Sequence, residues 1–472
     1  MRGASRHPAL AALAAAGLAM SSCTATIPPA RGPADLSPPA EYYADYRPAS
    51  GDSELWWQGF TDPVLDQLVQ DALADNLDVA AANSRLRAAR ALVDAEQSDL
   101  LPSAGVSGSV GGEAGTAGDS GLVAGAGLSA QLDLDLSGRL SAEVQAAAAN
   151  AAAAEYFLAD QRRLVAAAVA GQYIELRRTG ARLALLEEST DLQQQTLRIV
   201  TLRFEAGLSA NLDVRRAAAD LAQTRAQLGL LRLARARAGH ALSVLTGDTP
   251  GAVEEFAGQD AAIPAYAGGP PTGAPADLLR RRADILVAEA GLVEAAARVG
   301  VERSDLLPNL VLPANLVLGD GSLGGLVSDF FATVGASLDL PLFDGGRRRA
   351  EIAAAEAEAD ARFFEYRLTF LNALAEVENS LVAIDAFTDR NTELRQAIEE
   401  SETAFEQSRA LYREGLASLF DVLDAQRQLI ASRQSLIDSE ADLAASIIAL
   451  YAATGADPGS TPIRATLPVT GS

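Results

Sequence analysis

Side chains that could perform acid–base, nucleophilic or metal chemistry are scarce in this chain of 472 residues. It has two histidines, His7 and His240, one cysteine, Cys23, and no lysine, so all 38 basic residues are arginines. Without lysine there is no Walker-type phosphate loop and no Schiff base, and because His7 lies in a predicted leader that is removed, His240 alone cannot build a multi-histidine metal site. We therefore expect no catalysis, no metal and no cofactor. His240 is expected to be a packed or solvated helix residue.

The chain is strongly acidic, with 62 carboxylates against 38 arginines and a formal net charge of −24. Nucleic-acid binding needs surplus cations that neutralise phosphates. The charge balance therefore argues against nucleic acid as the main partner.

The single cysteine follows a pattern typical of a lipoprotein signal peptide. Two arginines precede an uncharged apolar run over residues 9–20, which is too short to span a bilayer, and small residues separate this run from Cys23. We predict a signal peptide over 1–22 and a covalent lipid on Cys23, the first residue of the mature chain. A signal cleaved elsewhere, with Cys23 unmodified, is the alternative.

The remaining chain contains one pattern twice. The segment Ser98–Pro102 recurs unchanged as Ser304–Pro308, and further matches follow in the same order after a two-residue insertion. Ordered matches over such a distance predict a tandem duplication. The repeats are expected over 62–248 and 277–456, with a linker over 249–276.

Each repeat is predicted to contain a helix, two strands, a long helix and a return helix. In the first repeat the helices are expected over about 76–100, 139–205 and 211–246. The long helix has no proline and closes at Gly207; at ~1.5 Å per residue it would be ~100 Å long. The two shorter helices, stacked end to end, would match it in length.

Two patterns constrain how these elements assemble. Apolar residues recur every seven positions in the return helices, which predicts supercoiled packing and fits both a helical barrel and a coiled-coil bundle. Strict apolar alternation around the glycine-rich loops at 111–121 and 319–325 predicts four strands, each long enough to cross a bilayer. Four strands cannot close into a membrane barrel. Either they form a soluble sheet or several chains pool their strands.

With these elements in place, the sequence resembles the TolC-like outer-membrane factors, most closely their lipid-anchored OprM and NodT type, over nearly the whole mature chain. The resemblance rests on Trp56-Trp57 with the residues after them, on the Leu-Leu-Pro segments ending at Pro102 and Pro308, and on residues 340–347, 412–416 and 424–427. Taken alone, Trp56 and Trp57 are expected to be buried packing residues.

The resemblance implies a mainly α-helical fold with a transmembrane β part. Long antiparallel coiled-coil helices would form a periplasmic α-barrel, and three copies would pool four strands each into a twelve-stranded outer-membrane barrel. Residues 23–61 would be a lipid-anchored tether with an N-terminal equatorial segment, which forms a collar with the linker and the tail at 457–472. The implied location is the outer membrane of a Gram-negative bacterium.

The function implied by the resemblance is that of a passive exit duct. A periplasmic adaptor and an inner-membrane pump, of RND type, would supply substrate and energy. The alternative is a lipid-anchored coiled-coil scaffold or adaptor with a soluble sheet. An adaptor would be expected to show one hairpin flanked by lipoyl-like halves rather than a tandem order.

The resemblance makes two turns the tips that dock the adaptor, although an ordinary glycine helix stop gives the same pattern. Asp213 and Asp421 are expected to cap the helices that follow these turns. The tip residues are Gly207, Leu208, Ser209, Gly415, Leu416 and Ser418.

The resemblance also implies a closed periplasmic gate beyond the second tip. Phe420 would form an apolar constriction, Asp424 a carboxylate ring, and Arg427 a neighbouring link. Three Asp424 side chains brought together would repel one another and favour cations. The alternative for Asp424 and Arg427 is a solvated i,i+3 ion pair. The matching positions of the first repeat are Arg216 and Ala219, so the ring would belong to the second repeat alone.

Overall fold

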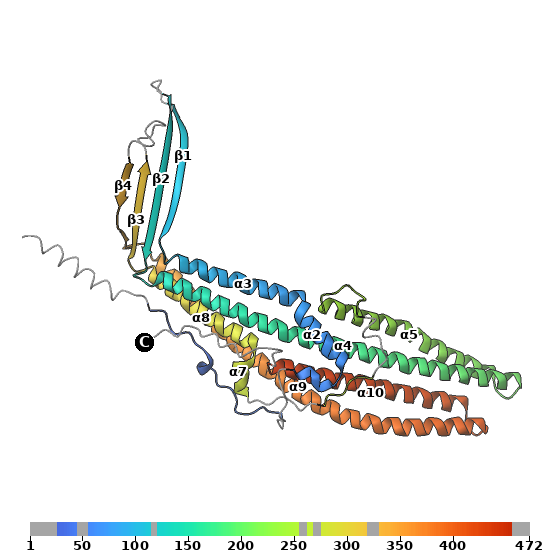
Figure 1. Ribbon diagram of the computed structural model, residues 1–472. Coiled ribbons are helices and arrows are strands. Elements are labelled where there is room, and N and C mark those ends of the chain that lie inside the picture. Colours follow the sequence, from blue (N-terminus) through green and yellow to red (C-terminus); the bar gives the residue numbers. More distant parts are fainter. Residues whose placement is uncertain are drawn as a thin grey trace, which may run out of the picture.

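The computed structural model describes residues 26–44, 55–114, 120–253, 262–267, 275–318 and 330–455. Long helices lie side by side, with a small sheet at one end and two helix–turn–helix tips at the other (Figure 1). Among the described residues, no helix combines the length and apolar character needed to cross a membrane.

The first half of the chain is built on α4 (Arg139–Glu205), which has the predicted bounds. α3 (Leu77–Ser98) and α5 (Asn211–Leu245) pack along it. α4 begins after Gly138 and stops just before Gly207, both in the left-handed region with φ of 78° and 71°. A left-handed glycine beyond each end and an alanine-rich interior without proline therefore define this helix of 67 residues.

The second half has three helices of the same lengths. α8 (Ala283–Ser304) has 22 residues like α3, α9 (Arg347–Arg413) has 67 like α4, and α10 (Leu419–Ala453) has 35 like α5. The order of helices predicted for both repeats is thus observed. The duplication itself and the repeat boundaries stay predictions.

A separate helix precedes α3 that the sequence analysis did not predict. After the short helix η2 (Trp56–Phe60), α2 (Pro63–Asp75) begins with the Asp62 side chain accepting from the Val64 N–H at 2.9 Å. Asn76 then ends α2 in an extended conformation and caps α3. An N-cap followed by proline at the first helical position is the local pattern that indicates such a start.

The sheet is antiparallel in the order β1 (Ser103–Ala114), β2 (Ser120–Leu134), β3 (Asn309–Leu318) and β4 (Phe330–Val334), with β5 (Ser337–Asp339) also paired to β3. Three of the four predicted strands are continuous. The fourth is split into β4 and β5 and ends at Asp339.

The split lies opposite a proline. Ala314 pairs with Val334 and Val311 with Ser337, so β4 and β5 keep one register across the break. The gap faces Pro313, which has no N–H to donate to the ladder, while the Gly335 N–H still donates to the Pro313 carbonyl at 2.9 Å. The fourth strand is therefore one strand interrupted by proline. β1 also includes Gly111 and Gly112, so the first loop is shorter than expected; residues 319–325 lie outside the described part.

The register sorts the described strand side chains onto two faces. One face is apolar and includes Val106, Leu128, Leu132, Leu134, Leu310, Leu312, Leu316, Val334 and Leu338. The other carries the polar residues Ser103, Ser129, Gln131, Asp133, Asn309, Asn315, Thr333, Ser337 and Asp339. Val311, Pro313, Val317 and Phe331 also lie on this second face, so it is mixed, whereas the first face, where the structure describes its side chains, is apolar throughout.

The central core is aromatic. Trp56 and Trp57 are 2 % and 1 % exposed, and Trp56 stacks on Tyr451 with ring centroids 5.5 Å apart. Tyr266, in the described part of the linker, shares a hydrogen bond with the Tyr451 hydroxyl at 2.6 Å. The expected packing role of the two tryptophans is confirmed, and Tyr266 of the linker packs into the same core.

The helices form a curved layer in which α4 is interior and α9 lies at an edge. α4 packs against α3 and α5 on one side and against α8 and α10 on the other, whereas α9 packs against α8 and α10. Buried side chains run along α4 from Leu140 to Val200, but α9 buries none before Tyr366. One edge of the layer is therefore α9, and the other is the column of α3 and α5.

Candidate functional site

Both predicted tips are glycine turns with one geometry. At the first, Gly207 has φ of 71° and the Leu208 N–H donates to the Arg203 carbonyl at 2.8 Å. At the second, Gly415 has φ of 76° and the Leu416 N–H donates to the Leu411 carbonyl at 2.8 Å. This is the hydrogen bonding of a Schellman helix end. The leucines that follow the glycines are 69 % and 76 % exposed.

The return helices start differently at the two tips. The Ser418 hydroxyl accepts from the Asp421 N–H at 3.3 Å, and the Asp421 carboxylate accepts from the Ser418 N–H at 2.9 Å, which completes a capping box for α10. The Ser418 hydroxyl also donates to the Asp421 carboxylate at 2.7 Å, and this hydrogen bond together with that from the Ser418 N–H holds the pKa of Asp421 below its ordinary value of 3.8. α5 starts at Ala210 with no side-chain cap. The expected cap is thus confirmed for Asp421 and wrong for Asp213, because Ala210 has no hydroxyl to complete the box.

A small core ties the two tips of one chain together. Val200, Ala217, Leu419 and Leu423, from α4, α5 and α10, are buried against one another. The Arg203 guanidinium lies 4.9 Å above the Tyr412 ring, which joins α4 to α9. Burial raises the pKa of the Tyr412 hydroxyl, although the Arg203 charge opposes this. The two hairpins therefore touch near their ends through this small cluster, and α10 otherwise scarcely contacts α5.

The three predicted gate residues share an exposed face of α10, at positions i, i+4 and i+7. Phe420 is 51 % exposed, and the side chains of Asp424 and Arg427 are 68 % and 52 % exposed. Asp424 and Arg427 form an i,i+3 ion pair at 3.7 Å. The single chain thus contains the solvated ion pair, and a ring of three Asp424 side chains stays a prediction.

The sequence analysis missed one carboxylate at this site. Asp220 of α5 is partly buried, and burial raises its pKa while the charge of Arg427 lowers it in part. Arg427 of α10 is therefore paired with Asp424 on its own helix and interacts electrostatically with Asp220 of α5. Only the tertiary contact reveals this, since the two positions lie in different halves of the sequence.

A polar cavity of about 550 Å³ lies where the sheet meets the helices. Asp133 and Gln131, from the polar face of β2, line it together with Asp99, Glu143 and Arg298 from the helical side. The polar face of the sheet thus continues into a charged recess between the helices.

The remaining candidates carry no chemistry in the described structure. His240 is exposed on α5, and the described residues contain no cluster of three histidine, cysteine or carboxylate side chains placed to hold a metal. Cys23 and the tail at 457–472 lie outside the described residues.

Comparisons with known proteins agree with this architecture. The family model described as outer membrane efflux protein matches residues 68–248 and 274–456. The chain is 30 % identical over 439 residues to nodulation protein T of Rhizobium leguminosarum bv. viciae, with 91 % of this chain and 90 % of that protein covered. It is also 30 % identical to the pyoverdine export outer membrane protein OpmQ of Pseudomonas aeruginosa, over 94 % and 96 % of the two chains.

The fold agrees as well. The solved outer-membrane channel OprN superposes with a TM-score of 0.81 at 31 % sequence identity, and the match covers 90 % of this chain and 98 % of that one. The predicted resemblance to outer-membrane factors is confirmed, and the relatives are efflux or export channels rather than enzymes. This chain belongs to the outer membrane efflux protein family.

Proposed function

We propose that the protein is the passive exit duct of a tripartite efflux or export system in a Gram-negative outer membrane. Three copies would form one channel, with a periplasmic adaptor and an inner-membrane pump of RND type supplying substrate and energy. The observation that carries the proposal is the sheet, whose described strands have one exposed apolar face, one face with most of the polar side chains, and two open edges.

The sheet is suited to lipid on one side and water on the other. Val106 and Val334, on the apolar face near opposite edges, are 84 % and 86 % exposed. β1 pairs only with β2 among the described strands, and β4 and β5 pair only with β3. Lipid tolerates no open strand edges, so such a sheet needs further strands at both edges. Three copies joined edge to edge would supply them.

The helical layer supports the same symmetry. Phe364 and Leu368 of α9 are 62 % and 57 % exposed, and Leu230 on the opposite edge of the layer is 70 % exposed. Packing α9 against the α3 and α5 column of the next copy would cover these side chains and close the ring. The polar recess beneath the sheet would then continue the water-filled path from the helices into the strands.

A lipid on Cys23 fits the path of the N-terminal segment. Ile27 lies against Gly300 near the sheet end of α8, where a Cβ on Gly300 would lie 2.7 Å from the isoleucine side chain. Four residues of chain reach at most about 14 Å, so Cys23 is within reach of the membrane side. Cys23→Ser should abolish lipid labelling; unchanged labelling would refute the anchor.

The tips provide a surface for the adaptor. Leu208 and Leu416 project apolar side chains from the two turns, and Ser209 and Ser418 lie beside them. The rival function, a lipid-anchored scaffold with a soluble sheet, would require something to cover the apolar sheet face. The exposure of that face and the match to efflux channels favour the duct.

Conductance of the purified protein in planar bilayers tests the proposal. The protein should be a trimer that conducts ions poorly, and Asp424→Ala should raise the conductance because the carboxylate ring and its links to Arg427 are lost. Arg216→Ala, at the matching position of α5, is the control and should leave the conductance low. A monomer without conductance in either form would overturn the duct.

A further inference from the structure

Each half of the chain has a junction where its two shorter helices meet end to end, α3 with α5 in the first half and α8 with α10 in the second. The last turn of α5 is hydrogen-bonded to the residue before α3, and the last turn of α10 to the residue before α8. A Cβ on Gly247 would lie 2.5 Å from the Asp75 carbonyl oxygen, and one on Gly455 would lie 2.9 Å from the Arg281 carbonyl oxygen. At both junctions, glycine thus lets the backbone after one helix approach the backbone before the next helix closely.

The first junction is held by a neutral side chain. Asn76 caps α3 through its side-chain oxygen Oδ1, which accepts from the Asp78 N–H at 2.9 Å. Its amide donates in the opposite direction, to the Leu245 carbonyl at the end of α5, at 2.8 Å. One short side chain therefore links the two helices.

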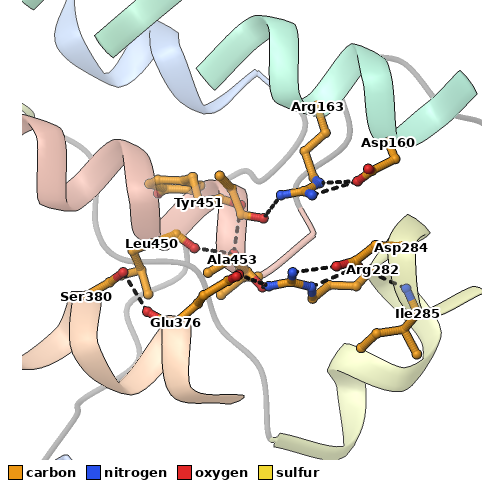
Figure 2. Close-up of polar contacts among 12 residues, drawn as sticks. Asp160, Arg163, Arg282, Asp284, Ile285, Glu376, Ser380, Leu450, Tyr451 and Ala453 are labelled. Atoms are coloured by element: carbon orange, nitrogen blue, oxygen red, sulfur yellow. Dashed lines mark hydrogen bonds and ion pairs between the residues drawn. The ribbon is translucent and has the colours of Figure 1, made fainter. Parts of the chain in front are cut away.

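The second junction is held by charge (Figure 2). Arg282 occupies the matching place, immediately before α8, and donates to the Ala453 carbonyl at the end of α10 at 2.9 Å. Its guanidinium also binds both oxygens of Asp284, at 3.0 and 2.6 Å, and Glu376 of α9 at 2.6 Å. Burial would raise the pKa of Asp284, but Arg282 outweighs it and holds this pKa below its ordinary value.

A second guanidinium reaches the same helix end from α4. Arg163 donates to the Ala452 carbonyl at 2.6 Å and pairs with Asp160 at 2.6 Å (Figure 2). Arg163 and Arg282 are only 7 % and 3 % exposed. Two buried guanidinium groups therefore donate to the last carbonyls of α10, whereas the described contact at the end of α5 is the neutral Asn76 amide.

Because α10 is long, a small change of angle at this junction would move its other end by several ångströms. From Ala453 to Asp424 the helix runs for about 44 Å at ~1.5 Å per residue. A tilt of about 10° at the junction would therefore move Asp424 by roughly 8 Å. We propose that Arg163 and Arg282 are positioning residues that fix the C-terminal end of α10 and thereby set the distance between its tip and the α5 tip. The proposal rests on the duct function for its consequence, since that distance would set the aperture at Asp424.

Spin labels on Leu208→Cys and Leu416→Cys test this within a single chain, because they measure the distance between the two tips. The chain without these added cysteines shows any contribution from a label on Cys23, and dilution with unlabelled protein removes distances between copies. Arg282→Gln and Arg163→Gln should lengthen or broaden the distance by on the order of 5 Å. Arg282→Lys, which keeps the charge but loses the fork, should restore it in part.

The first junction supplies the matched control. Asn76→Ser keeps an N-cap oxygen for α3 but lacks the amide that donates to Leu245, and it should change the distance less than the arginine variants do, because only one neutral hydrogen bond is lost. If Arg282→Gln fails to fold, the distance between the tips is measured in Arg163→Gln and in Glu376→Gln, which weakens the contact of Arg282 with the more exposed Glu376. Folded arginine variants with the wild-type distance, or an equal change in Asn76→Ser, would overturn the proposal. A changed distance in protein that never conducts would instead reject the duct.

Discussion

The α5 and α10 helices have equal lengths and the same glycine geometry at both ends, yet their ends are held by different chemistry. At the tip, Ser418 and Asp421 form a capping box for α10, while α5 starts without a side-chain cap. At the other end, buried arginines bind the last carbonyls of α10, whereas one asparagine amide reaches the last turn of α5.

This difference separates what the fold requires from what one half has added. Glycine turns and helix lengths set the backbone, so both halves keep them. N-caps stabilise the start of a helix, and buried charge-assisted hydrogen bonds add geometric specificity at its end. The half with the stronger fixation is also the half that carries Phe420, Asp424 and Arg427 on an exposed face.

The largest expected effect tests the shared part of the comparison. Gly247→Ala or Gly455→Ala should lower the free energy of unfolding by about 2–4 kcal/mol, because each adds a clash with backbone and a strained left-handed φ. Thermal unfolding followed by circular dichroism measures the loss. At Gly207 and Gly415 the same change meets open space and should cost about 1 kcal/mol. Equal losses at all four glycines would show that the close approach at the junctions is unimportant.

Much of the helical architecture could be predicted because its signals are local. The bounds of α4 follow from a proline-free run between the left-handed Gly138 and Gly207, and those of α5 are within one residue of expectation. α2 was missed although Asp62 and Pro63 carry a helix-start pattern, because α3 was expected to begin the unit. The split fourth strand depends on Pro313 of another strand, so its own alternation could not reveal it.

The candidate site was likewise predictable only where its signals are local. The tip glycines were predictable, since a helix end needs a left-handed residue there. The contacts of Arg282 and Arg163 with carbonyls of α10, and the approach of Arg427 to Asp220, join residues far apart in sequence. An arginine near a helix start has no local pattern that shows which carbonyl it will reach, so these contacts required the structure.

A smaller effect tests the caps. Ser418→Ala should cost about 1 kcal/mol at the start of α10, because an N–H of its first turn loses its acceptor. Ala210→Ser, which gives α5 the same N-cap residue type at an extended position, should gain about 0.5 kcal/mol. Amide hydrogen exchange over residues 211–214 and 419–422 reads both changes. Equal protection of the two segments in the unaltered protein would contradict the proposed difference between the tips.

The smallest expected effect is a pH dependence confined to the second tip. The pKa of Asp421 is lower in the folded protein than its ordinary value of 3.8, because the Ser418 hydroxyl and N–H donate to its carboxylate. Its contribution to stability is therefore complete above pH 3.8 and is lost as the pH falls through the lower, folded value. A spin label at Leu416 should gain mobility in that range, while one at Leu208 reports changes common to both tips. Because Ser418→Ala removes the hydroxyl that donates to the carboxylate, it should weaken this step; a step of unchanged size in that variant would mean that another carboxylate loosens the tip.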